Sequence, residues 1–267
     1  MTRFFLDRIL PLGQMTVELT GADAHHLRDV LRARPGEAVV ICDAAATDHR
    51  CEVIGSDAER VVLAVVERLS AETEPPYEAV LLQGLVKGDR MDVLVQKSVE
   101  LGVSRIVPFA AARSVVRLDR EDGVRKSERW SRIAEEAAKQ CGRSRIPRVD
   151  PPVPFDEALG IASRSDLSFL PWELESERSL LTWRREERTE LVLRASARNG
   201  RPPTLAFLIG PEGGFDGEEV RKALSAGLAT ISLGRRILRA ETAGPAVLAQ
   251  LSLLLEMDAD AFRTPRI

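Results

Sequence analysis

Residues 204–244 constrain the fold of this chain more than any other stretch. An apolar run at 204–209 stops at Gly210-Pro211, which predicts a buried strand that ends in a turn. A second apolar run at 228–233 stops in the same way at Gly234. The stretch therefore predicts two strands, each followed directly by a glycine-containing loop.

Helices are predicted after both glycine loops. Asp216 can accept hydrogen bonds from the free backbone N–H groups of a helix start, and Gly227 can close that helix. A final helix is predicted from 242 to about 257. Because ligands of open parallel sheets bind at the carboxyl ends of strands, we expect a binding site at the two loops.

The glycine loops have a simpler interpretation, since Gly-Pro and Gly-Gly pairs often mark only tight turns. Two such loops at equivalent strand ends favour a site, in which Gly210, Gly213 and Gly214 would leave room for a ligand beside the backbone. The loops are neither a phosphate loop nor a dinucleotide fingerprint, because no Gly-Lys-Ser/Thr or G-x-G-x-x-G pattern is present.

The rest of the chain divides in two by its pattern. Short apolar or alternating runs separated by turn residues predict a small β-rich unit up to about residue 70, with one helix at 22–33. A linker is predicted at 70–77. After it, strands and helices alternate, which predicts a mostly parallel sheet covered by helices. The later strands are expected at 79–86, 105–109 and 167–170, and the helices at 91–101 and 128–141.

The net charge of −3 does not by itself indicate nucleic-acid binding. Residues 113–148, however, include eleven Lys or Arg and only six acidic residues. Most of these cations are Arg, which makes planar contacts to phosphate. Solvated helix faces are the alternative interpretation. The three cysteines and three histidines have no metal-binding spacing, so no metal is expected. No apolar leader or membrane-spanning run is visible, which predicts a cytoplasmic protein.

The motifs Gly210-Pro211-Glu212-Gly213-Gly214-Phe215 and Leu233-Gly234-x-x-Ile237-Leu238-Arg239-x-Glu241-Thr242-Ala243 resemble those of the RsmE-type small-subunit ribosomal RNA methyltransferases, members of the SPOUT class. The resemblance covers nearly the whole chain. It implies an α/β protein with a PUA-like RNA-binding β-barrel at 1–72 and a SPOUT trefoil-knot methyltransferase domain at 73–267. It also implies methylation of uridine N3 with S-adenosylmethionine, and a homodimer. General topology rules do not predict a knot.

The same resemblance implies roles for individual residues. Arg239 and Glu241 are the expected catalytic residues, because they lie closest in the sequence to the expected position of the methyl group, and the N3 proton must leave and the charge that it leaves behind must be stabilised. Either residue could instead orient the loop through a salt bridge. The expected cofactor-binding residues are Leu208, Gly210, Pro211, Glu212, Gly213, Gly214, Leu233, Gly234, Ile237, Leu238, Arg239, Thr242 and Ala243. The expected contacts to substrate RNA, on the small ribosomal subunit or its RNA, are Arg28, Arg32, Arg34, Lys87, Arg113, Arg143 and Arg145.

Three alternatives stay open at this point. The chain could be a SPOUT-type methyltransferase for another RNA site, or a non-catalytic RNA-binding or ribosome-assembly factor, although its intact glycine loops argue against the latter. A small-molecule α/β enzyme is disfavoured, because the chain has arginine clusters and lacks a Ser or Cys nucleophile motif.

Overall fold

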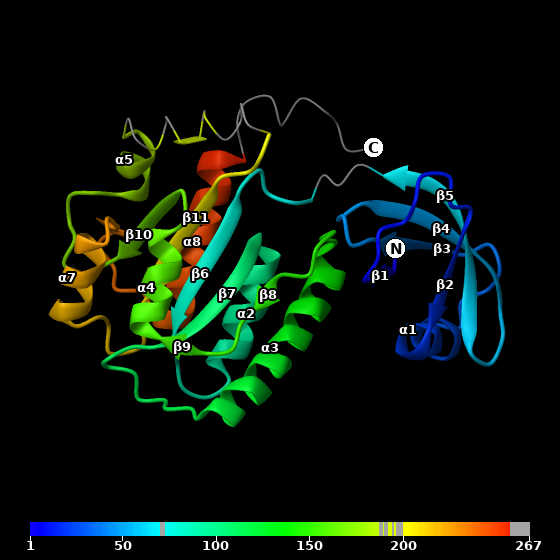
Figure 1. Ribbon diagram of the computed structural model, residues 1–267, viewed down its shortest axis with the longest axis horizontal. Coiled ribbons are helices and arrows are strands. Elements are labelled where there is room, and N and C mark those ends of the chain that lie inside the picture. The colour runs from blue at the N-terminus through cyan, green and yellow to red at the C-terminus, as the bar shows by residue number, and fades with distance from the viewer. Residues whose placement is uncertain (70–72, 187–188, 190–191, 194, 196–199, 257–267) are drawn as a thin grey trace. The chain divides into compact units, whose positions relative to one another are not determined.

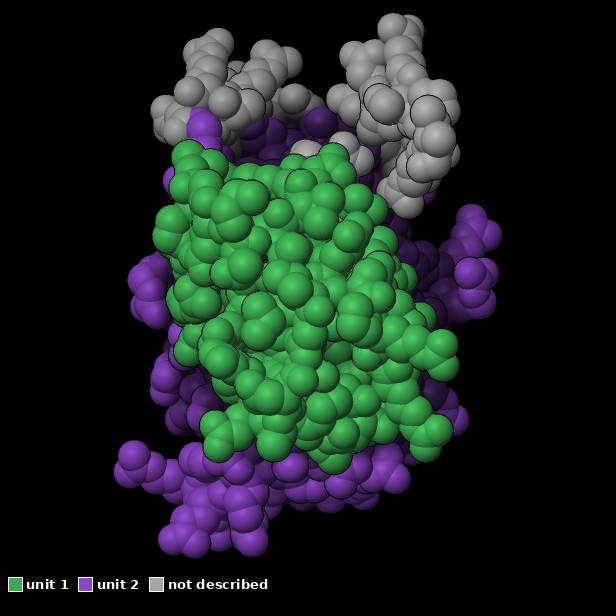
Figure 2. All heavy atoms as spheres, turned by 90° about the vertical axis from the view of Figure 1, so that its right-hand side faces the viewer, with its two compact units in different colours: residues 1–74, 138–146 green, residues 75–137, 147–267 purple. Residues whose placement is uncertain are grey.

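The computed structural model describes residues 1–69, 73–186, 189, 192–193, 195 and 200–256. It divides into two compact units (Figure 2). The first contains Met1–Glu74 and Ala138–Ile146, and the second contains Pro75–Ala137 and the chain from Pro147 onward. The assignment of 138–146 to the first unit had no signal in the sequence.

The first unit is a five-stranded curled sheet with the order β1-β3-β4-β5-β2. β1 pairs in parallel with β3, and the other pairs are antiparallel. Two register shifts along the β4–β5 pair locally disrupt the ladder and bend these long strands (Figure 1). The strands are β1 (Arg3–Phe5), β2 (Thr16–Thr20), β3 (Ala38–Cys42), β4 (Asp48–Ser56) and β5 (Arg60–Leu69). All were predicted except β1.

The helix expected at 22–33 is shorter and irregular. It consists of α1 (Gly21–His25) and one π-helical turn, η1 (His26–Val30), where the N–H of Leu31 reaches the carbonyl of His26. Leu27 is buried in the core of this unit, but Val30 and Leu31 are 59% and 44% exposed. The wider π turn thus changes which residues of this segment face the core.

The second unit is built on an all-parallel sheet with the order β12-β10-β11-β6-β7-β8, and β9 pairs beside β8 on β7. The predicted parallel sheet is thus confirmed. Its central strands, at 78–84 and 204–209, are nearly continuous buried apolar runs, as expected when both faces are covered. They are β6 (Glu78–Gly84), β7 (Val103–Ala110), β8 (Arg148–Val149), β9 (Val153–Pro154), β10 (Leu167–Pro171), β11 (Thr204–Ile209) and β12 (Ala229–Ile231).

Helices cover both faces of this sheet (Figure 1). α4 and α7 share one apolar cluster with Val80, Leu82 and Leu208. On the other face, α8 approaches Leu81 closely, and a Cβ at Gly244 would lie only 3.2 Å from Cδ2 of Leu81. α2 packs against α8. The helices are α2 (Arg90–Glu100), α3 (Arg120–Cys141), α4 (Phe155–Ser163), α5 (Leu180–Arg184), α7 (Gly217–Ser225) and α8 (Ala240–Leu255). α4 was not predicted. Within the described residues, no helix is long and apolar enough to cross a membrane.

Candidate active site

A cavity of about 470 Å³ lies at the carboxyl ends of β10, β11 and β12 in the second unit. These three strands are neighbours in the sheet, so the loops that follow them meet at one edge. The two glycine loops both line this cavity, as expected. The lining residues are Arg90, 171–173, 209–215, 232–241 and Ala243.

The first glycine loop is held by Glu212. Its Oε1 accepts a hydrogen bond from the backbone N–H of Lys87 at 2.9 Å and one from Nη1 of Arg90 at 3.2 Å. Burial disfavours the charged form of Glu212, but the hydrogen bonds and the charges of Arg90 and Lys87 outweigh it, so its pKa lies below the usual value. The carboxylate is therefore ionised and joins this loop to the start of α2.

Close packing explains the glycines of this region better than ligand access does. A Cβ at Gly84 would lie 2.6 Å from the backbone nitrogen of Pro211, and one at Gly213 would lie 3.0 Å from Cβ of Arg113. Gly214 has a φ of +67°, which side chains rarely adopt. The loop thus needs glycine to fold against the neighbouring segments, whatever it binds.

The second glycine loop carries the two expected catalytic residues. Arg239 is the N-cap residue of α8 and is exposed, and Glu241 lies in the first turn of the same helix. Oε1 of Glu241 lies 3.7 Å from Nε of Arg90. Its Oε2 is buried and has no hydrogen-bond partner within the described part of the chain. The guanidinium of Arg90 therefore lies between two carboxylates, that of Glu212 in the first glycine loop and that of Glu241 after the second.

Most of the expected cofactor-binding residues line the cavity, and two do not. Leu208 is fully buried in the apolar cluster that the sheet forms with α4 and α7. Alternate residues of a strand face opposite sides of the sheet, so Leu208 does not face the cavity. Thr242 is exposed and lies outside the cavity lining, one helix position after Glu241. Ile237, expected as part of an apolar wall, lines the cavity but is 89% exposed.

Several cavity residues were absent from the sequence-based prediction of the site. Arg90 begins α2, the helix that follows β6. Its place after the carboxyl end of a strand could have indicated that it belongs to the site. Trp172 follows β10, and the sequence does not show that β10 lies between β11 and β12. Glu173, the next residue in the chain, also lines the cavity.

The residues expected to contact RNA occur in both units. Arg32, Arg34, Lys87, Arg113 and Arg145 are exposed. Arg28 is partly buried. Its guanidinium donates hydrogen bonds to the carboxylate of Asp29 and to the backbone carbonyls of Asp57 and Ala58. The guanidinium of Arg28 is thus largely committed within the first unit.

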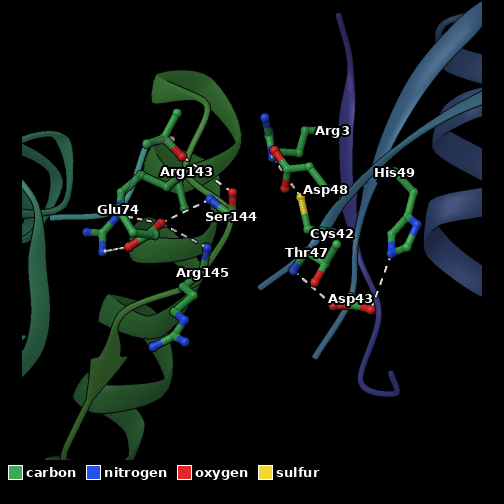
Figure 3. Close-up of polar contacts among 12 residues, drawn as sticks. Arg3, Cys42, Asp43, Thr47, Asp48, His49, Glu74, Arg143, Ser144 and Arg145 are labelled. Atoms are coloured by element: carbon green, nitrogen blue, oxygen red, sulfur yellow. Dashed lines mark hydrogen bonds and ion pairs between the residues drawn. The ribbon is translucent and has the colours of Figure 1, made fainter. Parts of the chain in front are cut away.

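Arg143, another residue expected to contact RNA, is buried. Its side chain is only 4% exposed, and Nη2 lies 2.6 Å from Oε2 of Glu74 (Figure 3). In this structure the carboxylate of Glu74 occupies the guanidinium, so a contact of Arg143 with RNA would require this carboxylate to leave.

The thiols and polar groups of the first unit form internal contacts (Figure 3). Nη1 of Arg3 lies 2.6 Å from Asp48 and 2.8 Å from the sulfur of Cys42. Burial raises the pKa of Cys42 to about 12 and that of Cys51 to about 11, so both thiols stay protonated. Cys42 and Cys51 are buried as predicted, and Cys141 is partly exposed. The described residues contain no cluster of three or more potential metal ligands.

Two family models identify the class of protein to which the chain belongs. A model of the RNA methyltransferase PUA domain matches residues 19–66, and a model of the RNA methyltransferase domain matches residues 73–252. The chain is therefore an RNA methyltransferase with an N-terminal PUA-like domain. It belongs to the family of the ribosomal RNA small subunit methyltransferases E, as the following relatives show.

The family is defined by relatives that span nearly the whole chain. The ribosomal RNA small subunit methyltransferase E of Bacillus subtilis is 33% identical over 242 residues, which is 91% of each chain. The Neisseria gonorrhoeae enzyme of that name, solved with bound S-adenosyl methionine, is 30% identical with a TM-score of 0.81, covering 97% of this chain and 100% of the other. A putative Legionella pneumophila methyltransferase, solved with bound cofactor SAM, has a TM-score of 0.77 at 30% identity and covers 94% and 97%.

Proposed function

We propose that this protein uses S-adenosylmethionine to methylate uridine N3 in small-subunit ribosomal RNA. The observation that carries the proposal is the meeting of two glycine loops, distant in sequence, at one cavity in a chain of this family. Small-subunit ribosomal RNA is proposed as the substrate because the relatives are named as methyltransferases of this RNA. The choice of uridine N3 rests on the resemblance of the loop motifs.

The cavity suits a cofactor of this type. Its volume of about 470 Å³ is within the range of small-molecule sites. Leu233 and Leu238 offer apolar surface, and the glycine loops offer backbone groups. The buried Oε2 of Glu241, which has no partner in the described residues, is an acceptor that a bound group could satisfy. S-adenosylmethionine supplies an electrophilic methyl group on its sulfonium sulfur.

The residues of the chain would act on the base. Neutral uridine carries a proton on N3, which a general base must accept for the nitrogen to act as a nucleophile. Glu241 is the proposed acceptor. Arg239, exposed at the cavity, would stabilise the negative charge that develops on the base. The target base must be turned out of any pairing for N3 to be reached.

The RNA and assembly partners are also part of the proposal. We propose that a PUA-like domain at 1–72 and the exposed cations Arg32, Arg34 and Arg145 bind RNA, together with Lys87 and Arg113 of the methyltransferase domain at 73–267. The SPOUT trefoil knot and a homodimer are proposed from the family resemblance. A cytoplasmic location is proposed because ribosomal RNA would be the substrate.

The test is methyl transfer from labelled S-adenosylmethionine to small ribosomal subunits that lack their own modifications, with the methylated nucleoside identified. We expect N3-methyluridine with wild type. Gly213→Trp should abolish it, because a side chain there meets Arg113 and fills the loop. Circular dichroism checks that the variant is folded.

Other outcomes would redirect the proposal. A different methylated nucleoside would indicate another RNA site. Failure of wild type both to bind the cofactor and to methylate RNA would favour a non-catalytic RNA-binding factor.

A further inference from the structure

The turn after α3 presents two adjacent backbone N–H groups to one carboxylate. Gly142 has a φ of +79°, and the N–H groups of Gly142 and Arg143 both close the helix on the carbonyl of Ala138 at 3.1 Å. The next two N–H groups are thereby left for another acceptor. Those of Ser144 and Arg145 donate to Oε1 of Glu74 at 3.0 and 3.2 Å (Figure 3).

The guanidinium of Arg143 completes this arrangement. Nε lies 3.3 Å from Oε1 of Glu74 and Nη2 lies 2.6 Å from Oε2. Four donors from three consecutive residues thus converge on one carboxylate. Consecutive backbone N–H groups combined with a forked guanidinium are the donor set of phosphate sites in proteins. A phosphodiester presents two anionic oxygens, as a carboxylate does, so the turn is chemically suited to either group.

Glu74 itself belongs to neither a helix nor a strand. Its side chain is 17% exposed, whereas that of Arg143 beneath it is 4% exposed. The carboxylate is therefore the more exposed member of the pair, and its departure would require only a local change in the coil. The exposed side chain of Arg145 adds a cation beside the opening.

We propose that the turn 142–145 is a binding site for a backbone phosphate of RNA, and that Glu74 occupies it as an internal competitor when RNA is absent. This inference rests on the proposed function for RNA as the ligand. It explains why the arginine is buried against a carboxylate. RNA binding would then exchange the Glu74 contact for a phosphate contact. The apparent affinity is the intrinsic affinity multiplied by the fraction of molecules in which the turn is free of Glu74.

The first experiment tests the site with inorganic phosphate and without RNA. In Glu74→Gln and Glu74→Ala, we expect the backbone amide NMR signals of Ser144 and Arg145 to shift as phosphate is added, and to shift much less in wild type. Glu67→Gln, which removes an exposed carboxylate from β5 of the same unit, is the matched control. Thermal melting confirms that each variant is folded, and Glu74→Gln, which keeps the side-chain shape, decides the result if the alanine variant unfolds.

The second experiment measures binding to purified small-subunit ribosomal RNA over a range of salt. In Glu74→Gln and Glu74→Ala, loss of the competing carboxylate should tighten binding to this RNA by on the order of tenfold. The slope of log affinity against log salt should stay as in wild type, because the turn contacts the same phosphate in both complexes. Glu67→Gln, which alters only the general charge, should leave the affinity nearly unchanged.

Absence of phosphate-dependent shifts at residues 144 and 145 in both Glu74 variants, with RNA affinity no tighter than that of Glu67→Gln, would overturn the proposal and leave Glu74 with a purely structural role. The phosphate titration requires neither RNA nor methyl transfer. A failure of the proposed function would appear in the methylation assay, so the two failures are distinguishable.

Discussion

Gly84 shows how a single residue can determine the shape of the cavity. The space beside its Cα is occupied by the backbone of the first glycine loop, with the nitrogen of Pro211 2.6 Å and the carbonyl carbon of Gly210 2.9 Å from an ideal Cβ. Neither backbone atom can rotate away as a side chain could. Any other residue at position 84 must therefore displace the loop that lines the cavity.

We expect Gly84→Ala to lower the free energy of unfolding by about 1 to 3 kcal/mol, the usual cost of overpacking, and to weaken binding of S-adenosylmethionine. Urea denaturation and calorimetric titration measure the two effects. Gly217→Ala is the control, because nothing lies within 4 Å of its Cβ position and its φ is ordinary. Equal stability and affinity of wild type and Gly84→Ala would show that the loop can move without cost.

At the scale of elements, the loop after β10 is tied to β12 by Glu175. Oε2 of Glu175 accepts a hydrogen bond from the hydroxyl of Thr230 at 2.7 Å, and Oε1 accepts from the N–H groups of Glu177 and Arg178 at 2.9 and 3.1 Å. These hydrogen bonds lower the pKa of Glu175 from 4.5 to about 2. The bond from Thr230 contributes most, and the bonds from the backbone N–H groups follow. The carboxylate form thus stabilises two strand ends beside the cavity.

This lowered pKa predicts a pH dependence of stability. Because the folded pKa lies below the unfolded value, the contribution is complete above about pH 4.5 and is lost as the pH falls toward about 2. We expect the difference in unfolding free energy between wild type and Glu175→Gln to shrink from about pH 7 to about pH 3. The effect is small, since water screens this partly exposed carboxylate. A difference that stays constant with pH in urea denaturation would contradict the assignment.

At the scale of the methyltransferase unit, Arg90 joins segments that are far apart in sequence. It comes from α2 and lies beside Glu212 of the first glycine loop and Glu241 of the second. No local pattern pairs these residues. The guanidinium can serve two carboxylates at once because its donors are held in a planar fork.

We expect Arg90→Ala to weaken binding of S-adenosylmethionine by about tenfold, equivalent to about 1.4 kcal/mol, because both loops lose a shared partner. Arg90→Lys should recover only part of the affinity, since an ammonium lacks the planar fork. Lys97→Ala is the control on the same helix, where Lys97 pairs only with Glu100 within the described residues. Calorimetry gives the affinities, and hydrogen exchange at 210–215 and 239–243 reports loop order. Unchanged affinity in Arg90→Ala would remove this role.

The sequence by itself determined the elements whose signals are local. The predicted strand at 204–209 coincides with β11. Asp216 caps α7 in a capping box with Glu219, and Gly227 follows the helix with a φ of +87°. Apolar runs, caps and left-handed glycines depend on neighbouring residues, so they are readable without the fold. The order of strands and helices then indicated a parallel sheet and the edge at which a site forms.

Only the tertiary structure decided which of these pieces meet. It placed β10 between β11 and β12, and with it Trp172 beside the glycine loops. It also buried Arg143 against Glu74 and put Leu208 in the core rather than in the cavity. Such pairings join residues separated by tens of positions, and each depends on how the whole sheet and its helices pack. A chain's local preferences are compatible with many partners, and the packing of the complete unit selects one.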